Sequence, residues 1–307
     1  MNRREVIFRT GAIVLAASFL ISPAAWAAES KAAKPKKVLF FSKSSGFEHS
    51  VIKRVGGNPS HAEKVLLELA PKHNIEFTFS KDGSLFTPDY LAGFDGYLFY
   101  TTGDLTTPGT DKQPPMSAEG KAAFLQAIKN GKGFIGSHSA SDTFHSPGNE
   151  KPGDARYVND GDAVDPYIAM IGGEFIMHGA QQKSRMIPVD PKFPGMSAVT
   201  EDFGPLEEWY SLKDFASNLH VLLVQDTTGM KGNMYQRPPF PATWARMYGQ
   251  GRVFYTNMGH REDIWTNPVF QEVLMGGIHW AVHDVEADVT PNIGKTTPKA
   301  NEMPPAK

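Results

Sequence analysis

Strand-like and helical segments alternate over the first half of the chain, and this alternation constrains the fold more than any other feature. The segment KVLFFS, residues 37–42, is a continuous apolar run, as expected for a parallel strand buried on both faces. Further strands are predicted at residues 75–80, 96–103 and 133–138. Helices capped by Ser60 and Ser117 are predicted between them. This order predicts a parallel sheet with right-handed crossovers.

The second half of the chain has a different pattern. Short apolar and aromatic segments follow one another with little helix between them, at residues 183–189, 207–212, 220–226, 243–249 and 251–257. They predict antiparallel extensions at one edge of the sheet. The last regular element is a helix over residues 268–283, with Phe270, Leu274 and Ile278 on its apolar stripe. The expected fold class is therefore α/β, with a mostly parallel central sheet.

The two ends of the chain differ from this central region. Residues 1–27 combine a charged start, an apolar run and the sequence Ala25-Trp26-Ala27, which is typical of a signal peptide. The pair Arg3-Arg4 is compatible with twin-arginine export as well as with an ordinary signal. Residues 28–35 are predicted to be a flexible leader, 36–287 a single domain, and 288–307 a loose tail rich in Pro and Lys. We therefore expect a periplasmic or secreted protein without a stable membrane anchor.

Composition excludes several classes of function. The 307 residues carry a formal net charge of −2 and form no basic stripe, so a nucleic-acid partner is not expected. The chain has no cysteine, which excludes thiolate nucleophiles and thiolate metal sites. Any soft-metal site must therefore use histidine and carboxylate ligands.

One motif resembles a nucleophile elbow but has the wrong residue at its centre. Gly136-Ser137-His138-Ser139-Ala140 has small residues two places on either side of the centre, as a tight turn between a strand and a helix requires. The centre of such a turn is normally Ser or Cys, whereas here it is His138. Metal ligation and proton transfer are the two tasks for which imidazole is suited near neutral pH.

Other histidines also follow predicted strands. His49, His138 and His260 come after three different strands, and His178 follows a predicted bend at Gly172-Gly173. Ligands of open α/β sheets bind outside the carboxyl ends of the strands, so these loops are expected to meet at one cleft. His138, His178 and His260 are predicted ligands of a divalent metal, zinc being the natural candidate. His49 and Asp104 are predicted to contact substrate at the same rim.

Carboxylates and aromatic residues complete the predicted site. Asp142 lies four residues after His138 and is predicted either to act with it as an acid or base or to cap a helix. Glu208 and Tyr210 share one face of a predicted strand. We assign Asp142 and Glu208 to catalysis with His138, and Tyr210 to substrate binding. Trp265 is predicted to offer a flat apolar face to a substrate, the alternative being a place in the core.

Six segments that together span residues 36–283 match the motifs of one protein family: KKVLFFSKSSGFEHS, GYLFYTTGDLT, GKGFIGSHSASD, YIAMIGGEFIMHG, EEWYSL and WARMYGQGRVFYTNMGHRED. On these segments the chain resembles the ThuA-like (trehalose-utilisation) family, which is related to class I glutamine amidotransferases. The resemblance implies a flavodoxin-like three-layer sandwich. It also implies a role in the use of trehalose, other disaccharides or oxidised (3-keto) sugars. Related amidotransferases carry a catalytic cysteine at the elbow, so His138 argues against glutamine hydrolysis.

Three functions remain open at this stage. The first is a sugar-processing enzyme, a hydrolase, lyase or isomerase, whose histidine-rich cleft holds zinc. The second is the same cleft working without metal, with His138 and Asp142 or Glu208 as general acid and base. The third is a non-catalytic carbohydrate-binding protein that uses its tryptophan faces. The sequence does not fix the oligomeric state.

Overall fold

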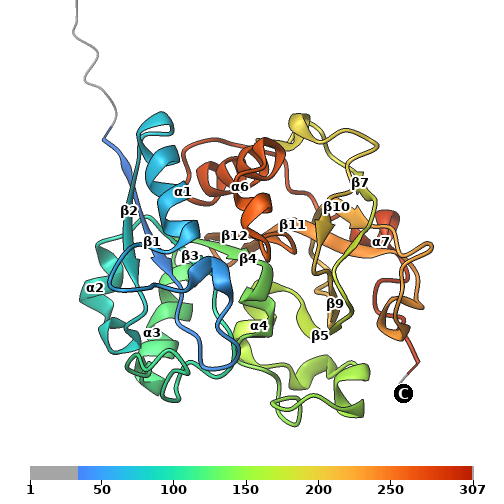
Figure 1. Cartoon of the computed structure of the whole chain (residues 1–307), viewed down its shortest axis with the longest axis horizontal. Coiled ribbons are helices and arrows are strands. Elements are labelled where there is room, and N and C mark those ends of the chain that lie inside the picture. Colours follow the sequence, from blue (N-terminus) through green and yellow to red (C-terminus); the bar gives the residue numbers. More distant parts are fainter. Residues whose placement is uncertain (1–33, 306–307) are drawn as a thin grey trace, which may run out of the picture. The chain divides into compact units, whose positions relative to one another are not determined.

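The computed structural model describes residues 34–305, so the predicted signal peptide and most of the predicted leader lie outside the described residues. An eight-stranded mixed sheet forms the centre, in the order β2-β1-β3-β4-β12-β11-β10-β7 (Figure 1). The strands of this sheet are β1 (Lys36–Phe41), β2 (Ile75–Ser80), β3 (Gly96–Phe99), β4 (Gly133–Ser137), β7 (Met186–Pro188), β10 (His220–Gln225), β11 (Phe240–Tyr248) and β12 (Gly251–Thr256).

The sheet has a parallel half and an antiparallel half, as the sequence predicts. β1 pairs in parallel with β2 and β3, and β4 pairs in parallel with β3 and β12. β11 is antiparallel to β12 and β10, and β7 is antiparallel to β10. The carboxyl ends of β1, β3, β4 and β12 therefore meet at one edge, where the loops that follow them lie side by side.

Helices cover both faces of the sheet and make three layers. They are α1 (His61–Leu69), α2 (Pro88–Ala92), α3 (Ala118–Lys129), α4 (Pro166–Ile171), α5 (Glu262–Trp265), α6 (Pro268–Ala281) and α7 (Ile293–Thr296). In Figure 1, α1 and α6 lie on one side of the sheet and α3 and α4 on the other. Alternation along β1 serves both layers, because Val38 and Phe40 pack with α1 and α6 whereas Leu39 and Phe41 pack with α2 and α3. This confirms the α/β sandwich.

Two small sheets carry the remaining strands and lie beside the carboxyl edge. β5 (Glu174–His178) pairs with β9 (Tyr210–Lys213), and β6 (Gln182–Lys183) pairs with β8 (Leu206–Glu207). Their register sets His178 opposite Tyr210 and Gln182 opposite Glu207. Glu208 and Trp209 are the two residues between β8 and β9, so these two pairings fix the position of Glu208.

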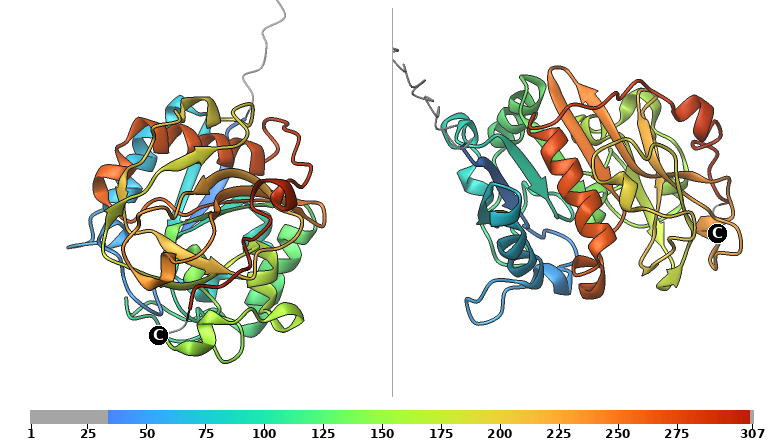
Figure 2. Two further views of the ribbon diagram at one scale, coloured as in Figure 1. Left: turned by 90° about the vertical axis from the view of Figure 1, so that its right-hand side faces the viewer. Right: turned by 90° about the horizontal axis from the view of Figure 1, so that it is seen from above.

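The segment after residue 288 is not the loose tail that its composition predicts. The Asn292 side chain accepts a hydrogen bond from Val221 N (2.6 Å) and donates one to Val221 O (3.1 Å). Ile293 and Ala300 are buried, and Arg237 donates to the Ala300 carbonyl. The segment runs across the antiparallel strands (Figure 2). These contacts satisfy backbone groups of β10, which is a tertiary role that composition does not reveal.

Among the residues that the structure describes, no helix is both long enough and apolar enough to cross a membrane.

Candidate functional site

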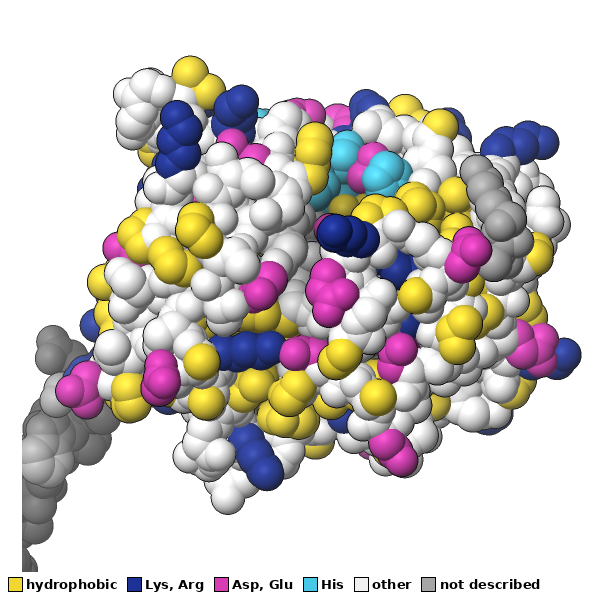
Figure 3. Space-filling model, turned by 90° about the horizontal axis from the view of Figure 1, so that it is seen from below, with side chains coloured by type: hydrophobic (Ala, Val, Ile, Leu, Met, Phe, Trp, Pro, Cys, Tyr) yellow, Lys and Arg dark blue, Asp and Glu magenta, His cyan; other side chains and the backbone are white. Residues whose placement is uncertain are grey.

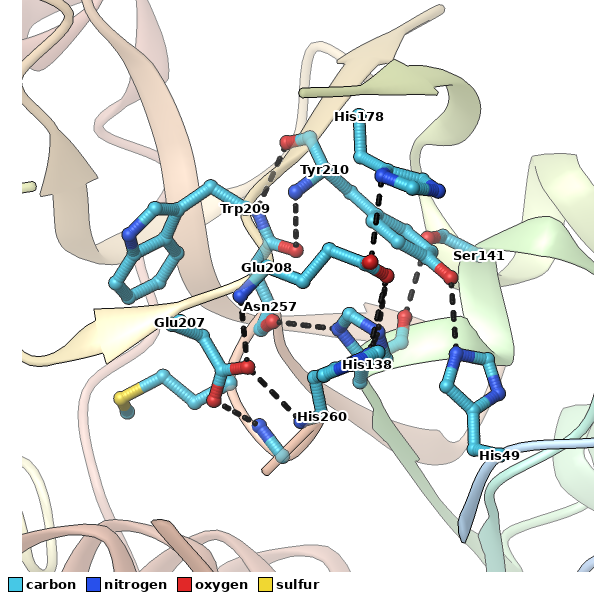
Figure 4. Close-up of polar contacts among 12 residues, drawn as sticks. His49, His138, Ser141, His178, Glu207, Glu208, Trp209, Tyr210, Asn257 and His260 are labelled. Carbon is cyan, nitrogen blue, oxygen red and sulfur yellow. Dashed lines mark hydrogen bonds and ion pairs between the residues drawn. The ribbon is translucent and has the colours of Figure 1, made fainter. Parts of the chain in front are cut away.

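Four side chains from separate loops meet at the carboxyl edge of the parallel half. They are His49 after β1, His138 after β4, Glu208 between β8 and β9, and His260 after β12 (Figure 4). One ligand atom from each lies within 4.8 Å of those of the others. The sequence predicts that these loops meet, and the sheet order explains it, because β1, β3, β4 and β12 all end at this edge.

His138 occupies a sharp turn, as its surroundings in the sequence predict. Its φ is +45°, in the left-handed region that residues other than glycine seldom adopt. A 3-10 helix, His138–Asp142, follows directly where the motif predicts a helix. The Tyr255 hydroxyl donates to the His138 carbonyl (2.8 Å) and helps to hold the turn. A strained backbone at a cluster of ionisable groups is typical of a functional position.

Glycine allows the loop of His260 to approach this turn. Gly259 has a φ of +127°, and a Cβ there would lie 2.6 Å from Ser137 Oγ. Its carbonyl accepts hydrogen bonds from Tyr100 Oη (3.1 Å) and Trp265 Nε1 (2.7 Å). Only a residue without a side chain fits here, and its position brings the next residue, His260, against His138.

The Glu208 carboxylate is the centre of the cluster. One oxygen lies 3.0 Å from His260 Nδ1 and 3.6 Å from His138 Nε2. The other oxygen lies 3.3 Å from His178 Nδ1. His260 Nδ1 and His138 Nε2 are themselves 3.3 Å apart. Three imidazole nitrogens therefore lie close to one carboxylate. They cannot all donate a hydrogen bond to it, so lone pairs of nitrogen and oxygen atoms at the centre remain without a proton donor.

Sequence reasoning missed Glu207, whose hydrogen bonds hold two parts of the site together. This carboxylate is fully buried and accepts hydrogen bonds from the backbone N–H groups of Glu208 (2.9 Å), Gly259 (3.2 Å) and His260 (3.1 Å). Burial raises its pKa to about 7, against the lowering effect of these bonds. Glu207 thus ties the loop of His260 to the strand end that carries Glu208. The charged residue next to Glu208 is visible in the sequence, but nothing there shows that it points inward.

The surroundings of the cluster suit a metal ion. His138 Nδ1 lies 3.1 Å from the Asn257 carbonyl, which can only accept, so this nitrogen carries the proton and Nε2 presents its lone pair to the centre. A histidine ligand of zinc is oriented in this way by a carbonyl behind it. Nδ1 of His49 is buried and has no hydrogen-bond partner within the described part of the chain. The donor set of three imidazoles and one carboxylate could hold a metal ion, and zinc takes ligands of both types.

The pKa values of the histidines in the site shift in different directions. Burial lowers the pKa of His49 well below its ordinary value, and the neighbouring histidines lower it further. Burial also lowers the pKa of His138, although Glu208 partly offsets it. For His260, burial lowers the pKa, but the hydrogen bond to Glu208 and the charges of the nearby glutamates together outweigh burial and raise the pKa. Burial alone would raise the pKa of Glu208, but its contacts with His138 and His260 hold it below its ordinary value. Burial thus favours the neutral form of His49 and His138, which is the form that binds a metal.

Some predicted residues take other places. The predicted metal ligands were His138, His178 and His260. In the structure, His178 contacts Glu208 but is not one of the four converging groups. His49 and Glu208 take its place beside His138 and His260. Tyr210 lies inside the site, with its ring 4.1 Å from that of His138 and its hydroxyl 3.4 Å from His49 Nε2. It is buried, so it supports the histidines and presents little surface to a substrate.

Three other predicted residues do not face the cluster. Asp142 accepts from His145 Nε2 (2.7 Å) instead of orienting His138. Asp104 accepts from the backbone and hydroxyl of Thr106 and borders a separate cavity of about 430 Å³. Trp265 is fully buried, so it cannot offer a face to a sugar. The elbow turns the chain after His138 away from the cluster, which explains Asp142, whereas the apolar surface of Trp265 packs on Phe40 and Phe270.

A family model confirms the resemblance. The model of ThuA, trehalose utilisation, matches residues 37–281. The chain belongs to the ThuA family. A ThuA-like protein from Bacteroides uniformis is 18% identical over 82% of this chain and 94% of its own, with a TM-score of 0.58. A ThuA-like protein from Parabacteroides merdae is 18% identical over 83% and 92%, with a TM-score of 0.53. Both likenesses show the fold alone. Among curated protein sequences, no significant match to this chain is found.

Membership of the ThuA family places the protein in a carbohydrate-related group, since the family is described by trehalose utilisation. A group of histidine side chains reaches the surface at a hollow on one face, next to an acidic side chain (Figure 3). His178 and His260 are the more accessible histidines of the site, with side-chain exposures of 39% and 17%. The site is therefore open on the side of these two residues and closed behind His49 and His138.

Proposed function

We propose that this ThuA protein is an exported enzyme that acts on a disaccharide or on its oxidised (3-keto) form. The observation that carries the proposal is the convergence of His49, His138, Glu208 and His260 at one end of the sheet. Clusters of ionisable groups with opposite pKa shifts are characteristic of catalytic sites. The family supplies the class of substrate, and the cluster supplies the chemistry.

These four side chains would hold a divalent metal, with zinc the best fit to the donor set. A bound metal of this kind polarises a carbonyl or hydroxyl oxygen and so eases proton removal from a neighbouring carbon or hydroxyl. Tyr210 packs on His138 and keeps water from that side of the centre. The reaction classes that fit are hydrolysis, elimination and isomerisation of a sugar.

His178 and Glu208 are the groups of the chain placed to move a proton. His178 Nδ1 lies 3.3 Å from Glu208 Oε1, and the imidazole is exposed on its other side. A proton can therefore pass between the carboxylate and a molecule at the surface through the imidazole ring. In a metal-free mechanism, a different pair, His138 and Glu208, would act as acid and base.

The structure argues against the alternative of a binding protein that stacks sugars on these tryptophan rings. Trp209, Trp244 and Trp265 are all fully buried. Their indole N–H groups donate to the backbone carbonyls of Gln182, Ile171 and Gly259. These tryptophan rings belong to the core, so the cluster of ionisable side chains is the better candidate for the functional site.

The test combines elemental analysis with activity. Mature protein purified from its native host should contain close to one zinc per chain and turn over a disaccharide or its 3-keto form in a screen. Glu208→Gln should lose both properties. Asp190→Asn is the matched control, because this carboxylate also contacts a histidine, His220, but lies outside the cluster. A Glu208→Gln protein with full turnover would remove the proposed active site.

Export is tested separately by N-terminal sequencing of the same preparation. The Ala25-Trp26-Ala27 pattern predicts a mature N-terminus near Ala28. An intact Met1 on the folded protein from the host would contradict export.

A further inference from the structure

A cavity of about 240 Å³ adjoins the candidate site on its open side. It is lined by Asp154, Tyr157, Met177, His178, Asn233 and Met234, with Gly153 at its edge. These residues come from the 3-10 helix Asp154–Tyr157, from β5 and from the 3-10 helix Asn233–Tyr235. His178 belongs to both places, since it lines the cavity and contacts Glu208. Whatever binds in the cavity therefore lies next to the reacting groups.

Three side chains of this cavity carry polar atoms that are open to a ligand. Within residues 34–305, the exposed Asp154 carboxylate and the half-buried Tyr157 hydroxyl form no side-chain hydrogen bond or ion pair, whereas Asn233 Nδ2 donates to the Pro305 carbonyl (3.5 Å). Asn233 Oδ1 is buried and has no hydrogen-bond partner within these residues. Buried polar atoms are normally satisfied, and a group left unpaired costs free energy unless a ligand or water meets it. The buried amide oxygen of Asn233 is thus available to a ligand hydroxyl, beside the exposed carboxylate of Asp154 and the phenol of Tyr157.

The rest of the cavity is apolar, and its shape is set by rigid contacts. Met177 and Met234 line it, and the neighbouring Tyr235 hydroxyl donates to the Trp209 carbonyl (2.5 Å) and accepts from Gly179 N (2.9 Å). These bonds fix the 3-10 helix of Asn233 against the strand end that follows Glu208. Pockets that bind small molecules combine an apolar lining with a few polar groups in this way.

We propose that this cavity is the binding subsite for the second sugar ring of a disaccharide. The inference rests on the proposed function, because it assumes that the first ring lies at the His–Glu cluster. The Tyr157 ring offers an aromatic surface to the sugar ring, and Asp154 and Asn233 bind its hydroxyls. His178 then lies where the two rings join, which makes it a positioning residue for the linkage as well as a route for protons.

Binding to zinc-loaded full-length mature protein tests the subsite. The probes are trehalose and maltose as disaccharides and glucose as the single ring, measured by isothermal titration calorimetry. The disaccharides should bind at least about tenfold more tightly than glucose. Tyr157→Ala and Asn233→Ala should each weaken disaccharide binding by about tenfold and leave glucose binding unchanged. Tyr157→Phe should retain most of the disaccharide preference, since the ring face is kept.

Val158→Ala is the matched control, because this exposed residue adjoins Tyr157 in sequence but does not line the cavity. It should bind both probes as the unchanged protein does. Equal affinity for disaccharides and glucose, or equal losses for both in Tyr157→Ala, would overturn the subsite. These outcomes are distinct from failure of the proposed function, which Glu208→Gln reports through metal content and turnover.

Discussion

Two clusters of potential metal ligands lie in the described part of this protein, and they differ in what balances their charge. In the first, three histidines surround Glu208, and no lysine or arginine of residues 34–305 forms an ion pair with the carboxylate. In the second, Asp160, Glu174 and Asp214 lie together around Lys213. The fully buried ammonium of Lys213 is 2.6 Å from Asp160 and 3.5 Å from Asp214.

The comparison separates a structural cluster from a functional one. The acidic cluster already contains its cation, and Glu174 is further bound by His145 (2.8 Å) and Ser146 (2.6 Å). A metal ion there would have to displace a lysine. The described part of the chain places no lysine or arginine in the histidine cluster, where imidazole nitrogens are directed at a common centre. Proximity of ligand atoms alone therefore does not identify a metal site. The presence or absence of a protein cation beside the carboxylates distinguishes the two clusters.

The largest expected effect comes from changing the elbow residue of the histidine cluster. His138→Asn should lower turnover by about 10²–10⁴-fold and reduce metal content, because it removes the Nε2 lone pair. Asparagine tolerates the left-handed backbone of this position, so the protein should remain folded. Turnover, bound zinc and melting temperature are measured on one preparation.

The control is His220→Asn, which alters a histidine with similar partners, a backbone carbonyl and a carboxylate, outside the cluster. It should keep zinc and turnover. If His138→Asn also kept both, the two clusters would be alike in lacking a functional role.

The next effect concerns the acidic cluster. Lys213→Met keeps the length of the side chain but leaves buried carboxylates without their cation, so it should cost about 3–5 kcal/mol of unfolding free energy. Zinc content should not change. Urea denaturation measures the loss, and Lys299→Met, at an exposed ion pair with Glu302, serves as the control with no measurable change. A stable Lys213→Met protein that bound additional metal would show that the acidic cluster is also a metal site.

A smaller effect is expected from His145, which links the acidic cluster to Asp142. Burial alone would lower its pKa, but the hydrogen bonds to Asp142 and Glu174 outweigh burial and raise it. A raised folded-state pKa means that the stabilisation is complete below the unfolded-state pKa and is lost as pH rises through the folded-state value.

His145→Gln should therefore destabilise the protein by about 2 kcal/mol at about pH 6 and by less at about pH 9. Unfolding free energies at the two pH values measure this difference. An equal loss at both would show that the imidazolium does not contribute through its charge.

The smallest effect is expected from Asp142. Its carboxylate bonds to His145 and not to His138, so Asp142→Asn should reduce turnover by less than about tenfold and leave zinc bound. Steady-state kinetics beside Glu208→Gln provide the test. A loss as large as that of Glu208→Gln would assign Asp142 to the histidine cluster after all.

Much of the fold could be predicted because it follows from local patterns. Apolar runs separated by capped helices predict a parallel sheet, and β1 and β4 lie within one residue of the predicted segments. The meeting of His49, His138 and His260 also follows from sequence, since parallel strands place their following loops at one edge. The tail after residue 288 could not be predicted, because its polar residues gain order only from contacts with β10 and Arg237.

Sequence alone determined which residue types are present, the strand ends that they follow and the unusual histidine at the elbow. Only the tertiary structure decided that Glu208 points into the cluster, that Glu207 holds it there and that Trp265 is core. The same holds for Asp142, which joins His145, and for Lys213, which neutralises the second cluster. The physical reason is that the direction of a side chain and the charge facing it depend on partners distant in sequence, which local periodicity does not encode.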